Sequence, residues 1–443
     1  MAQETAWGRL RSGVMVLLAL SLSCAHADRP ASPHRLDLSF PPLSAQETSR
    51  QQRLVAGHGQ FLIGFGRAMP TSGEETRVDA VPCQVLPSGL ASCALRVRSP
   101  GAVGLRLGVR VDRLPVQATL RFISPDGTPR AVVSGVDVNA SLAADQVAGA
   151  SGLLYWSPVF VGEALVLEIE LPVGVDPEQV QVSVPQVSHL FRLPWLQTEI
   201  HTETDCYRDV SCDKGAERIS RATALILFTD ADGETGTCTG SLLADVDPAT
   251  DIPYLLTAHH CVADQPKASS IESLWRYRAR ECDGPAETHL WVRGGADLMA
   301  TVRSADSSLL RLRQPSPEGS AFARWSTALP LEGEPVLSIH HPHGKPQKLT
   351  KGRLKDYLHC EDAAYCGEDA DPDGIHYLSV AWTAGVTKSG SSGAGLFLVS
   401  TGELIGVLSG GLSSCDTPEG ADDYGWLGYW GHSSIIGGLD QQR

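Results

Sequence analysis

Residues 385–396 read GVTKSGSSGAGL, in which Ser392 stands between glycines and shortly before an apolar run at 396–399. A serine on a turn that leads into a strand is typical of an exposed nucleophile. Glycines permit positive φ, leave room for a substrate carbonyl, and free N–H groups to bind a developing oxyanion. Because GSSG also occurs in many flexible loops, an ordinary loop remains an alternative for this stretch on its own.

Two upstream segments supply the partners that an activated serine needs. LLTAHHC at 255–261 places His260 beside a cysteine, and ADSSLL at 305–310 contains Asp306. A histidine can act as general base, and an aspartate can hold its tautomer and stabilise the imidazolium. Each segment alone also fits a structural role, a core histidine near a disulfide or an aspartate at a strand start. Their order along the chain, with CTGSL at 238–242 upstream, favours a catalytic triad of His260, Asp306 and Ser392.

The segments CTGSL, LLTAHHC, DSSLL, HHPHG, GVTKSGSSG and GGLSSC resemble those of the bacterial lysyl endopeptidases, a branch of the trypsin-like serine peptidases. The resemblance runs from about Cys206 to about Tyr429, and TAHHC with GSSG is its most specific part. It implies an all-β peptidase domain of two Greek-key β-barrels with the triad in the cleft between them. It also implies a secreted serine endopeptidase that forms an acyl-enzyme, cleaves protein or peptide substrates after lysine, and uses no cofactor.

The resemblance also implies roles for individual residues. His260 is preferred over His259 as the base because the family's catalytic histidine directly precedes the cysteine. The backbone N–H groups of Gly390 and Ser392 would form the oxyanion hole. The residue before the nucleophile is Ser391, which has no charge to pair with a new N-terminal ammonium. Activation by the ion pair of trypsin-like zymogens is therefore not expected.

Substrate specificity would depend on a different set of residues. Asp422, the first residue of DDYG at 422–425, is the candidate partner of a lysine ammonium, and Gly410 and Gly411 would also line the substrate site. Trypsin instead has an aspartate six residues before its nucleophile, where this chain has Val386. A solvated acidic loop is the alternative interpretation of Asp422.

Three residues near these motifs depart from the family pattern. Lys388 replaces an acidic residue four positions before the nucleophile, Ser409 replaces a histidine, and Gly395 replaces a proline. The departures leave open the same machinery with another preference, for arginine or a small residue. A catalytically silent trypsin-like binding protein is a further alternative, against which the complete triad argues.

The chain has 11 cysteines, and without Cys24 in the signal an even set of ten remains, which suggests five disulfides in an oxidising compartment. No CxxC spacing occurs, so no metal site is expected. The resemblance implies three pairs, and the other four cysteines would pair locally. The expected pairs are Cys206–Cys415, Cys212–Cys282, Cys238–Cys261, Cys83–Cys93 and Cys360–Cys366.

Residues 1–27 read as a secretory signal, with Arg9 and Arg11 before an apolar run at 14–22 and AHA at 25–27. Lipidation of Cys24 would make the protein an outer-membrane lipoprotein, but simple secretion, extracellular or periplasmic, is favoured. The net charge of −15 gives no reason to expect a nucleic-acid partner. We expect a monomer.

Residues 28–190 are expected to form a β-sandwich resembling the family's propeptide, because segments such as 164–171 alternate apolar and polar residues between turn signals. Helical periodicity is nearly absent, and residues 28–52 read as a loose lead-in. A linker at 191–205 precedes the peptidase domain at 206–443. The first lysine is Lys214, so a lysine-specific enzyme would not excise this domain. We expect any zymogen-like control to come from the domain covering the cleft.

Overall fold

The computed structural model describes residues 35–56, 60–69, 83–125, 127–150, 153–196, 206–245, 247, 250–362, 365–368 and 374–431. The predicted signal, Cys24 and the linker from 197 to 205 lie outside these ranges. Within them, none of the helices combines the length and the apolar character that a membrane span requires.

The N-terminal part is a β-sandwich of two sheets around one apolar core, as expected. Side chains from both layers meet in this core, among them Leu95, Leu167, Leu107 and Val182. The first sheet contains β1 (Arg35–Ser39), β3 (Cys83–Val85), β4 (Ala91–Arg98), β6 (Thr119–Ile123), β7 (Pro129–Ser134) and β10 (Ala164–Leu171). The second layer contains β2 (Phe61–Ala68), β5 (Gly104–Arg113), β8 (Tyr155–Trp156), β9 (Phe160–Val161) and β11 (Gln181–Leu190).

The expectation of a loose lead-in at 28–52 is wrong for its described part. This part contains β1, which pairs with β4, and most of α1 (Ala45–Ala56). A capping box starts α1, because the Ser44 N–H donates to Glu47 and the Glu47 N–H donates to Ser44 Oγ. A second helix, α2 (Gly135–Val147), begins with Ser134 as its N-cap. Both helices begin with local capping signals that apolar periodicity does not reveal.

The C-terminal part begins with one barrel-like set of strands whose core includes Ile226, Leu255 and Leu310. Strand β15 (Tyr254–Thr257) pairs with β14 (Thr235–Leu243) on one side and with β19 (Ser307–Leu312) on the other. The histidine motif ends just after β15 and the aspartate directly precedes β19, so both lie at the ends of neighbouring strands. The set comprises β13 (Thr223–Thr229), β14 (Thr235–Leu243), β15 (Tyr254–Thr257), β16 (Glu272–Trp275), β17 (Leu290–Val292), β18 (Ala296–Val302) and β19 (Ser307–Leu312). The short helices α3 (Glu217–Ser220) and α4 (Gln265–Ser269) accompany these strands.

The second set of strands closes on itself into a barrel, because β23 (Tyr377–Ala384) pairs with both β26 (Ala421–Trp426) and β21 (Lys348–Asp362). Its core includes Val380, Leu396 and Tyr424. The strands of the ring are β20 (Pro335–His340), β21 (Lys348–Asp362), β23 (Tyr377–Ala384), β24 (Gly395–Leu398), β25 (Leu404–Gly411) and β26 (Ala421–Trp426). At its periphery are β12 (Arg208–Asp209), β22 (Tyr365–Glu368) and α5 (Leu427–Gly431).

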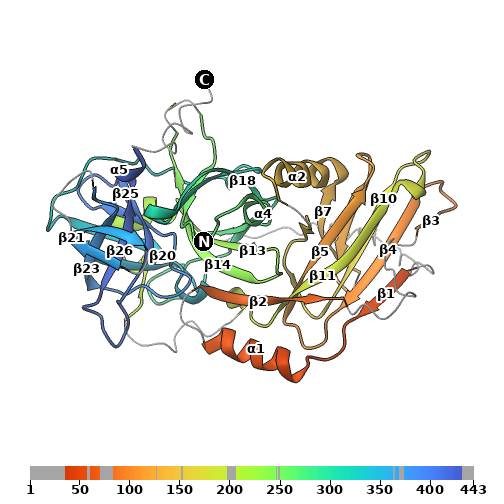
Figure 1. Cartoon of the computed structure of the whole chain (residues 1–443), viewed down its shortest axis with the longest axis horizontal. Helices are drawn as coiled ribbons and strands as arrows, with labels where there is room; N and C mark the ends of the chain where they lie inside the picture. The colour runs from red at the N-terminus through yellow and green to blue at the C-terminus, as the bar shows by residue number, and fades with distance from the viewer. Residues whose placement is uncertain are drawn as a thin grey trace, which may run out of the picture. The chain divides into compact units, whose positions relative to one another are not determined.

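The sandwich and the first set of C-terminal strands share one 12-stranded sheet, because β2 pairs with β14 (Figure 1). Ile63 of the sandwich packs in one core with Leu225 and Leu274 of the C-terminal part. Arg106 of β5 is 1 % exposed and donates to Thr229 Oγ1 and the Ser270 carbonyl. The two parts are therefore joined by strand pairing, apolar packing and a buried guanidinium.

Four disulfides join described cysteines: Cys83–Cys93, Cys206–Cys415, Cys212–Cys282 and Cys238–Cys261. These include the three pairs that the resemblance implies. Cys360 and Cys366 lie opposite each other where β21 pairs with β22, but their side chains are outside the described part. Each bridge that closes a long loop stabilises the fold by about 2–4 kcal/mol.

Candidate active site

Asp306 lies on the turn between β18 and β19, with φ 41° and ψ 54°, and directly precedes Ser307, the first residue of β19. Its Oδ1 accepts the His260 backbone N–H at 2.9 Å, and its Oδ2 lies 2.7 Å from His260 Nδ1. Ser409 Oγ also donates to Oδ2, at 2.6 Å. Burial acts to raise the pKa of Asp306, but the bonds from His260 and Ser409 outweigh it and hold the pKa below its ordinary value. An ionised carboxylate is thus placed to hold the imidazole with its proton on Nδ1.

His260 follows β15 on a turn that the Cys238–Cys261 disulfide ties to β14. Its side chain is 36 % exposed, and the described hydrogen bonds of its ring include none at Nε2. The neighbouring His259 instead places Nδ1 2.7 Å from Thr301 Oγ1. The structure therefore brings His260, rather than His259, together with the aspartate.

Ser392 lies on the turn between β23 and β24. This turn packs against β14 and against the residues that follow β15, just before His260. The Ser392 carbonyl accepts the Thr239 N–H at 2.8 Å. A Cβ at Gly393 would lie 2.3 Å from the Thr239 carbonyl oxygen and 2.9 Å from Ala258 N, so only glycine permits this approach. Among the hydrogen bonds of the described residues, none joins Ser392 Oγ to His260, and such bonds often form only with substrate bound.

The turn also presents two unused backbone donors. Ser391 N–H donates to the Lys388 carbonyl and Gly393 N–H to the Leu408 carbonyl, whereas the described hydrogen bonds include none from the N–H of Gly390 or Ser392. Gly390 has φ +95°, a conformation that favours glycine. These alternate N–H groups are available to a negatively charged oxygen.

Asp422 is fully buried on β26, and its carboxylate has only neutral donors. Oδ2 accepts three bonds and Oδ1 accepts one, from the Ser413 N–H. Among the ion pairs between described residues, none includes Asp422. The three donors to Oδ2 are Trp382 Nε1 at 2.6 Å, Ser413 Oγ at 2.6 Å and Thr387 Oγ1 at 2.8 Å.

Gly410 and Gly411 lie at the end of β25, and Gly411 pairs with Asp422. A Cβ at Gly411 would lie 2.2 Å from Asp422 Oδ1, so this oxygen faces the space that a side chain at 411 would fill. A Cβ at Gly410 would meet nothing within 4 Å. Both glycines are exposed, so the end of β25 beside the buried carboxylate is in contact with solvent. Sequence reasoning missed the donors that surround Asp422, although Thr387 belongs to the motif GVTKSGSSG and Ser413 to GGLSSC.

The structure also places the residues that depart from the family pattern. Ser409 is the third donor to Asp306, and Gly395 is the first residue of β24. Val386, at the position of trypsin's aspartate, is buried. Lys388 is half-buried, and the described ion pairs include none between it and an acidic side chain. Lys388 therefore does not neutralise Asp422.

Two groups of described side chains are close enough together to bind a metal ion, but the cysteines of both are in disulfides. A sulfur in a disulfide is not a thiolate, which is the form that binds metals. The groups are Cys238 with His260 and Cys261, and Cys212 with Cys282 and Asp283.

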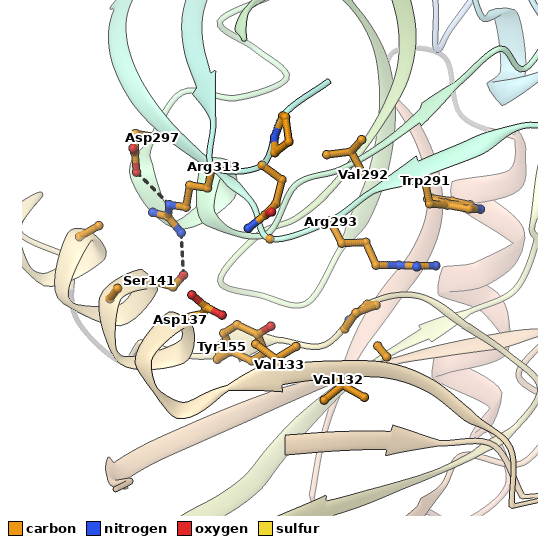
Figure 2. A pocket seen from close by; sticks show the side chains of 17 residues that line it. Val132, Val133, Asp137, Ser141, Tyr155, Trp291, Val292, Arg293, Asp297 and Arg313 are labelled. Atoms are coloured by element: carbon orange, nitrogen blue, oxygen red, sulfur yellow. Dashed lines mark hydrogen bonds and ion pairs between the residues drawn. The ribbon is translucent and has the colours of Figure 1, made fainter. Parts of the chain in front are cut away.

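A cavity of about 790 Å³ lies away from these residues, between α2 and the segment that carries Trp291 and Arg293. Figure 2 shows Arg313 linking Asp297 to Ser141 of α2 across one end of it. None of the predicted site residues lines this cavity, so it is not part of the candidate active site.

Comparison with protein families gives two matches that together cover most of the chain. Residues 200–425 match the family described as "Lysyl endopeptidase, C-terminal domain", and residues 39–191 match "Lysyl endopeptidase N-terminal domain". The chain is also 28 % identical over 434 residues to a lysyl endopeptidase of Pseudomonas aeruginosa. That alignment covers 91 % of this chain and 87 % of the relative.

Solved structures give weaker likenesses. An HtrA-type protease, AlgW, with a tripeptide is 19 % identical, with a TM-score of 0.34. That match covers 50 % of this chain and 62 % of the other, less than two thirds. A protease from M. tuberculosis in its active form is 16 % identical, with a TM-score of 0.34 and coverage of 54 % and 92 %.

Proposed function

We propose, from the premise that this chain belongs to the lysyl endopeptidase family, that it cleaves peptide bonds after lysine with Ser392 as nucleophile. The chain is a serine endopeptidase that acts on peptide substrates. The observation that carries the proposal is the carboxylate of Asp306, which binds both the backbone N–H and the ring Nδ1 of an exposed His260.

In the proposed reaction, Ser392 Oγ attacks the scissile carbonyl as its proton passes to His260 Nε2. The N–H groups of Gly390 and Ser392 bind the resulting oxyanion, and donors of this kind contribute roughly 3 kcal/mol each. His260 then protonates the leaving amine as the C–N bond breaks. A water molecule, deprotonated by His260, hydrolyses the acyl-enzyme and restores the serine.

We propose Asp422 as the residue that selects lysine. Oδ2 already accepts three donors, so only Oδ1 has capacity for a substrate cation. A guanidinium binds best to two open oxygens, whereas an ammonium is a compact charge that one oxygen can meet. The ammonium would approach Oδ1 from the side of Gly411. A buried carboxylate without an ionic partner is costly in free energy, so binding a cation there would be favourable. This asymmetry supports lysine over the alternative of arginine.

We also propose that residues 1–27 direct secretion, which the four disulfides between described cysteines support. Residues 28–190 would then remain with the peptidase domain at 206–443 after signal removal. The pairing of β2 with β14 and the absence of lysine before Lys214 both support retention. The exposure of the His260 side chain argues against our expectation that this domain covers the cleft.

The experiment is active-site labelling with a fluorophosphonate, followed by peptide mapping. The label should attach to Ser392, and Ser392→Ala should abolish both labelling and hydrolysis. Attachment to the adjacent Ser391 would refute the assignment. Peptides with Lys, Arg, Glu or Leu before the scissile bond then separate the three candidate functions, and a protein that neither labels nor cleaves any of them would be a silent binding protein.

A further inference from the structure

His340, the last residue of β20, lies in contact with the residue that precedes the proposed nucleophile. Its Nδ1 is 2.8 Å from Ser391 Oγ, and both side chains are fully buried. The backbone N–H of Lys388 also donates to Ser391 Oγ, at 3.1 Å. The Ser391 hydroxyl thus links the proposed oxyanion turn, through Lys388 and Ser391, to strand β20 of the second barrel.

The available partners favour one sense of this hydrogen bond. Ser391 Oγ accepts the Lys388 N–H, and His340 Nδ1 is the other hydrogen-bonding partner of Ser391 Oγ among the described residues. A hydroxyl oxygen can accept two bonds, but if Nδ1 donated, the hydroxyl proton would have no acceptor among these residues. We therefore assign the hydroxyl as donor to Nδ1, with the imidazole proton on Nε2. That Nε2 is buried with no partner among the described residues, a costly arrangement for a polar atom.

The imidazole is neutral, and its neighbours keep it so. Burial lowers the pKa of His340 to about 3, and repulsion from His341 and Lys348 acts in the same direction. Lys348 of β21 lies opposite His340 where β20 pairs with β21, and its ammonium forms an ion pair with Asp209. A neutral hydrogen bond therefore holds Ser391 throughout the pH range in which a serine peptidase works.

Other contacts fix the backbone on either side of Ser391. Thr239 Oγ1 donates to the Gly390 carbonyl at 3.0 Å, and His343 N–H donates to the Ser389 carbonyl at 2.7 Å. The Ser391 N–H donates to the Lys388 carbonyl, and the Ser391 carbonyl accepts the Ala394 N–H at 3.1 Å. These backbone bonds close the turn on itself, whereas the bond between Ser391 Oγ and His340 fixes the turn against β20. The orientation of the two free N–H groups at Gly390 and Ser392 then depends in part on that side-chain bond.

We propose that His340 is a positioning residue that orders the oxyanion hole by binding Ser391 Oγ, in place of an ion pair at this position. The inference rests on the proposed function, because it requires Ser392 to be the nucleophile and its N–H an oxyanion donor. His340 itself touches neither substrate nor reacting atoms.

The test compares two substitutions of one residue. His340→Leu fills a similar volume without a polar atom, whereas His340→Asn places an amide oxygen where Nδ1 stands. His340→Leu should lower kcat between about 10-fold and about 10³-fold, as loss of an oxyanion donor does, and leave KM within about threefold. His340→Asn should recover most of kcat. Ser391→Ala should reproduce the loss, and His340→Leu should add little to it in the double variant.

The chain contains a matched control in its N-terminal sandwich. His189 Nδ1 lies 2.8 Å from Ser99 Oγ, both side chains are fully buried, and His189 Nε2 also has no partner among the described residues. His189→Leu should lower the melting temperature as His340→Leu does, but leave kcat at the wild-type value. Measurements are made well below both melting temperatures.

The outcomes separate the inference from the function on which it rests. An active wild-type protein whose folded His340→Leu and Ser391→Ala variants keep its kcat refutes the inference alone, as does an equal kcat loss in His189→Leu. If His340→Leu does not fold, Ser391→Ala decides the matter, because it removes one hydroxyl with little change of volume. A wild-type protein that neither labels nor hydrolyses refutes the proposed function and the inference together.

Discussion

Two buried aspartates, Asp306 and Asp422, stand at the candidate site with opposite surroundings. Asp306 binds an ionisable partner, the exposed His260, through both carboxylate oxygens. Asp422 binds only neutral donors, three of them on one oxygen. Asp306 therefore has a cationic partner once the imidazole is protonated, whereas Asp422 has none among the residues that the structure describes.

The difference indicates which step each carboxylate serves. A carboxylate beside the imidazole stabilises a charge that develops during every turnover, so its effect should not depend on the substrate. A buried carboxylate without an internal cation gains most from a substrate that brings one, so its effect should appear only with basic substrates. The predictions below follow this contrast from the largest expected effect to the smallest.

Asp306→Asn should lower kcat by about 10⁴-fold on every substrate, because the amide supports the wrong imidazole tautomer and cannot stabilise the imidazolium. The measurement is steady-state hydrolysis of a lysine peptide and of a neutral ester. A loss confined to the lysine peptide would assign Asp306 to binding rather than to catalysis.

Asp422→Asn should lower kcat/KM for a lysine peptide by at least about tenfold, or about 1.4 kcal/mol, because the substrate ammonium loses its charged partner. The matched control is Asp423→Asn, which changes the neighbouring, half-buried aspartate of the same strand. The control should remain within about twofold of wild type. Equal losses in the two variants would mean that both residues act through the stability of β26.

Asp306 should also contribute to stability in a pH-dependent way. Its pKa is lowered in the folded protein, so the ionised form stabilises the fold above the unfolded pKa of about 4, and this stabilisation is lost as pH falls through the folded pKa. The gap in urea midpoint between wild type and Asp306→Asn should therefore be widest near neutral pH and narrow below about pH 4. A gap that widens in acid would show that the pKa is raised instead.

Lys388→Glu should give the smallest effect, a rise in lysine preference of no more than about threefold, because half-exposed charges without direct contact interact weakly. The rise should disappear in about 1 M salt, where screening is nearly complete. A change above tenfold that persists in salt would indicate direct contact between Lys388 and Asp422 in the substrate complex.

Local motifs made the main features of the fold and site predictable. The alternating strands predicted the all-β sandwich, and TAHHC with the downstream aspartate pointed to the pair that the structure brings together, His260 and Asp306. Such motifs are readable because each depends on residues within a few positions of one another.

The remaining features depend on contacts between distant segments. The pairing of β2 with β14 joins residues near 62 to residues near 236, and no periodicity within either strand specifies it. Trp382 reaches Asp422 only because β23 and β26 are neighbours in the closed barrel. Helix α1 was predictable in principle, since SAQE at 44–47 is a capping-box sequence, but apolar periodicity did not reveal it.

The most direct test of the account is the ratio of kcat/KM for two peptides that differ only in having lysine or norleucine before the scissile bond. The ratio is measured in wild type, Asp306→Asn and Asp422→Asn. We predict that Asp306→Asn slows both peptides equally and preserves a wild-type preference for lysine, whereas Asp422→Asn lowers the ratio by at least about tenfold. A ratio that Asp422→Asn leaves unchanged, or that Asp306→Asn lowers to the same extent, would contradict the separation of catalysis from lysine recognition.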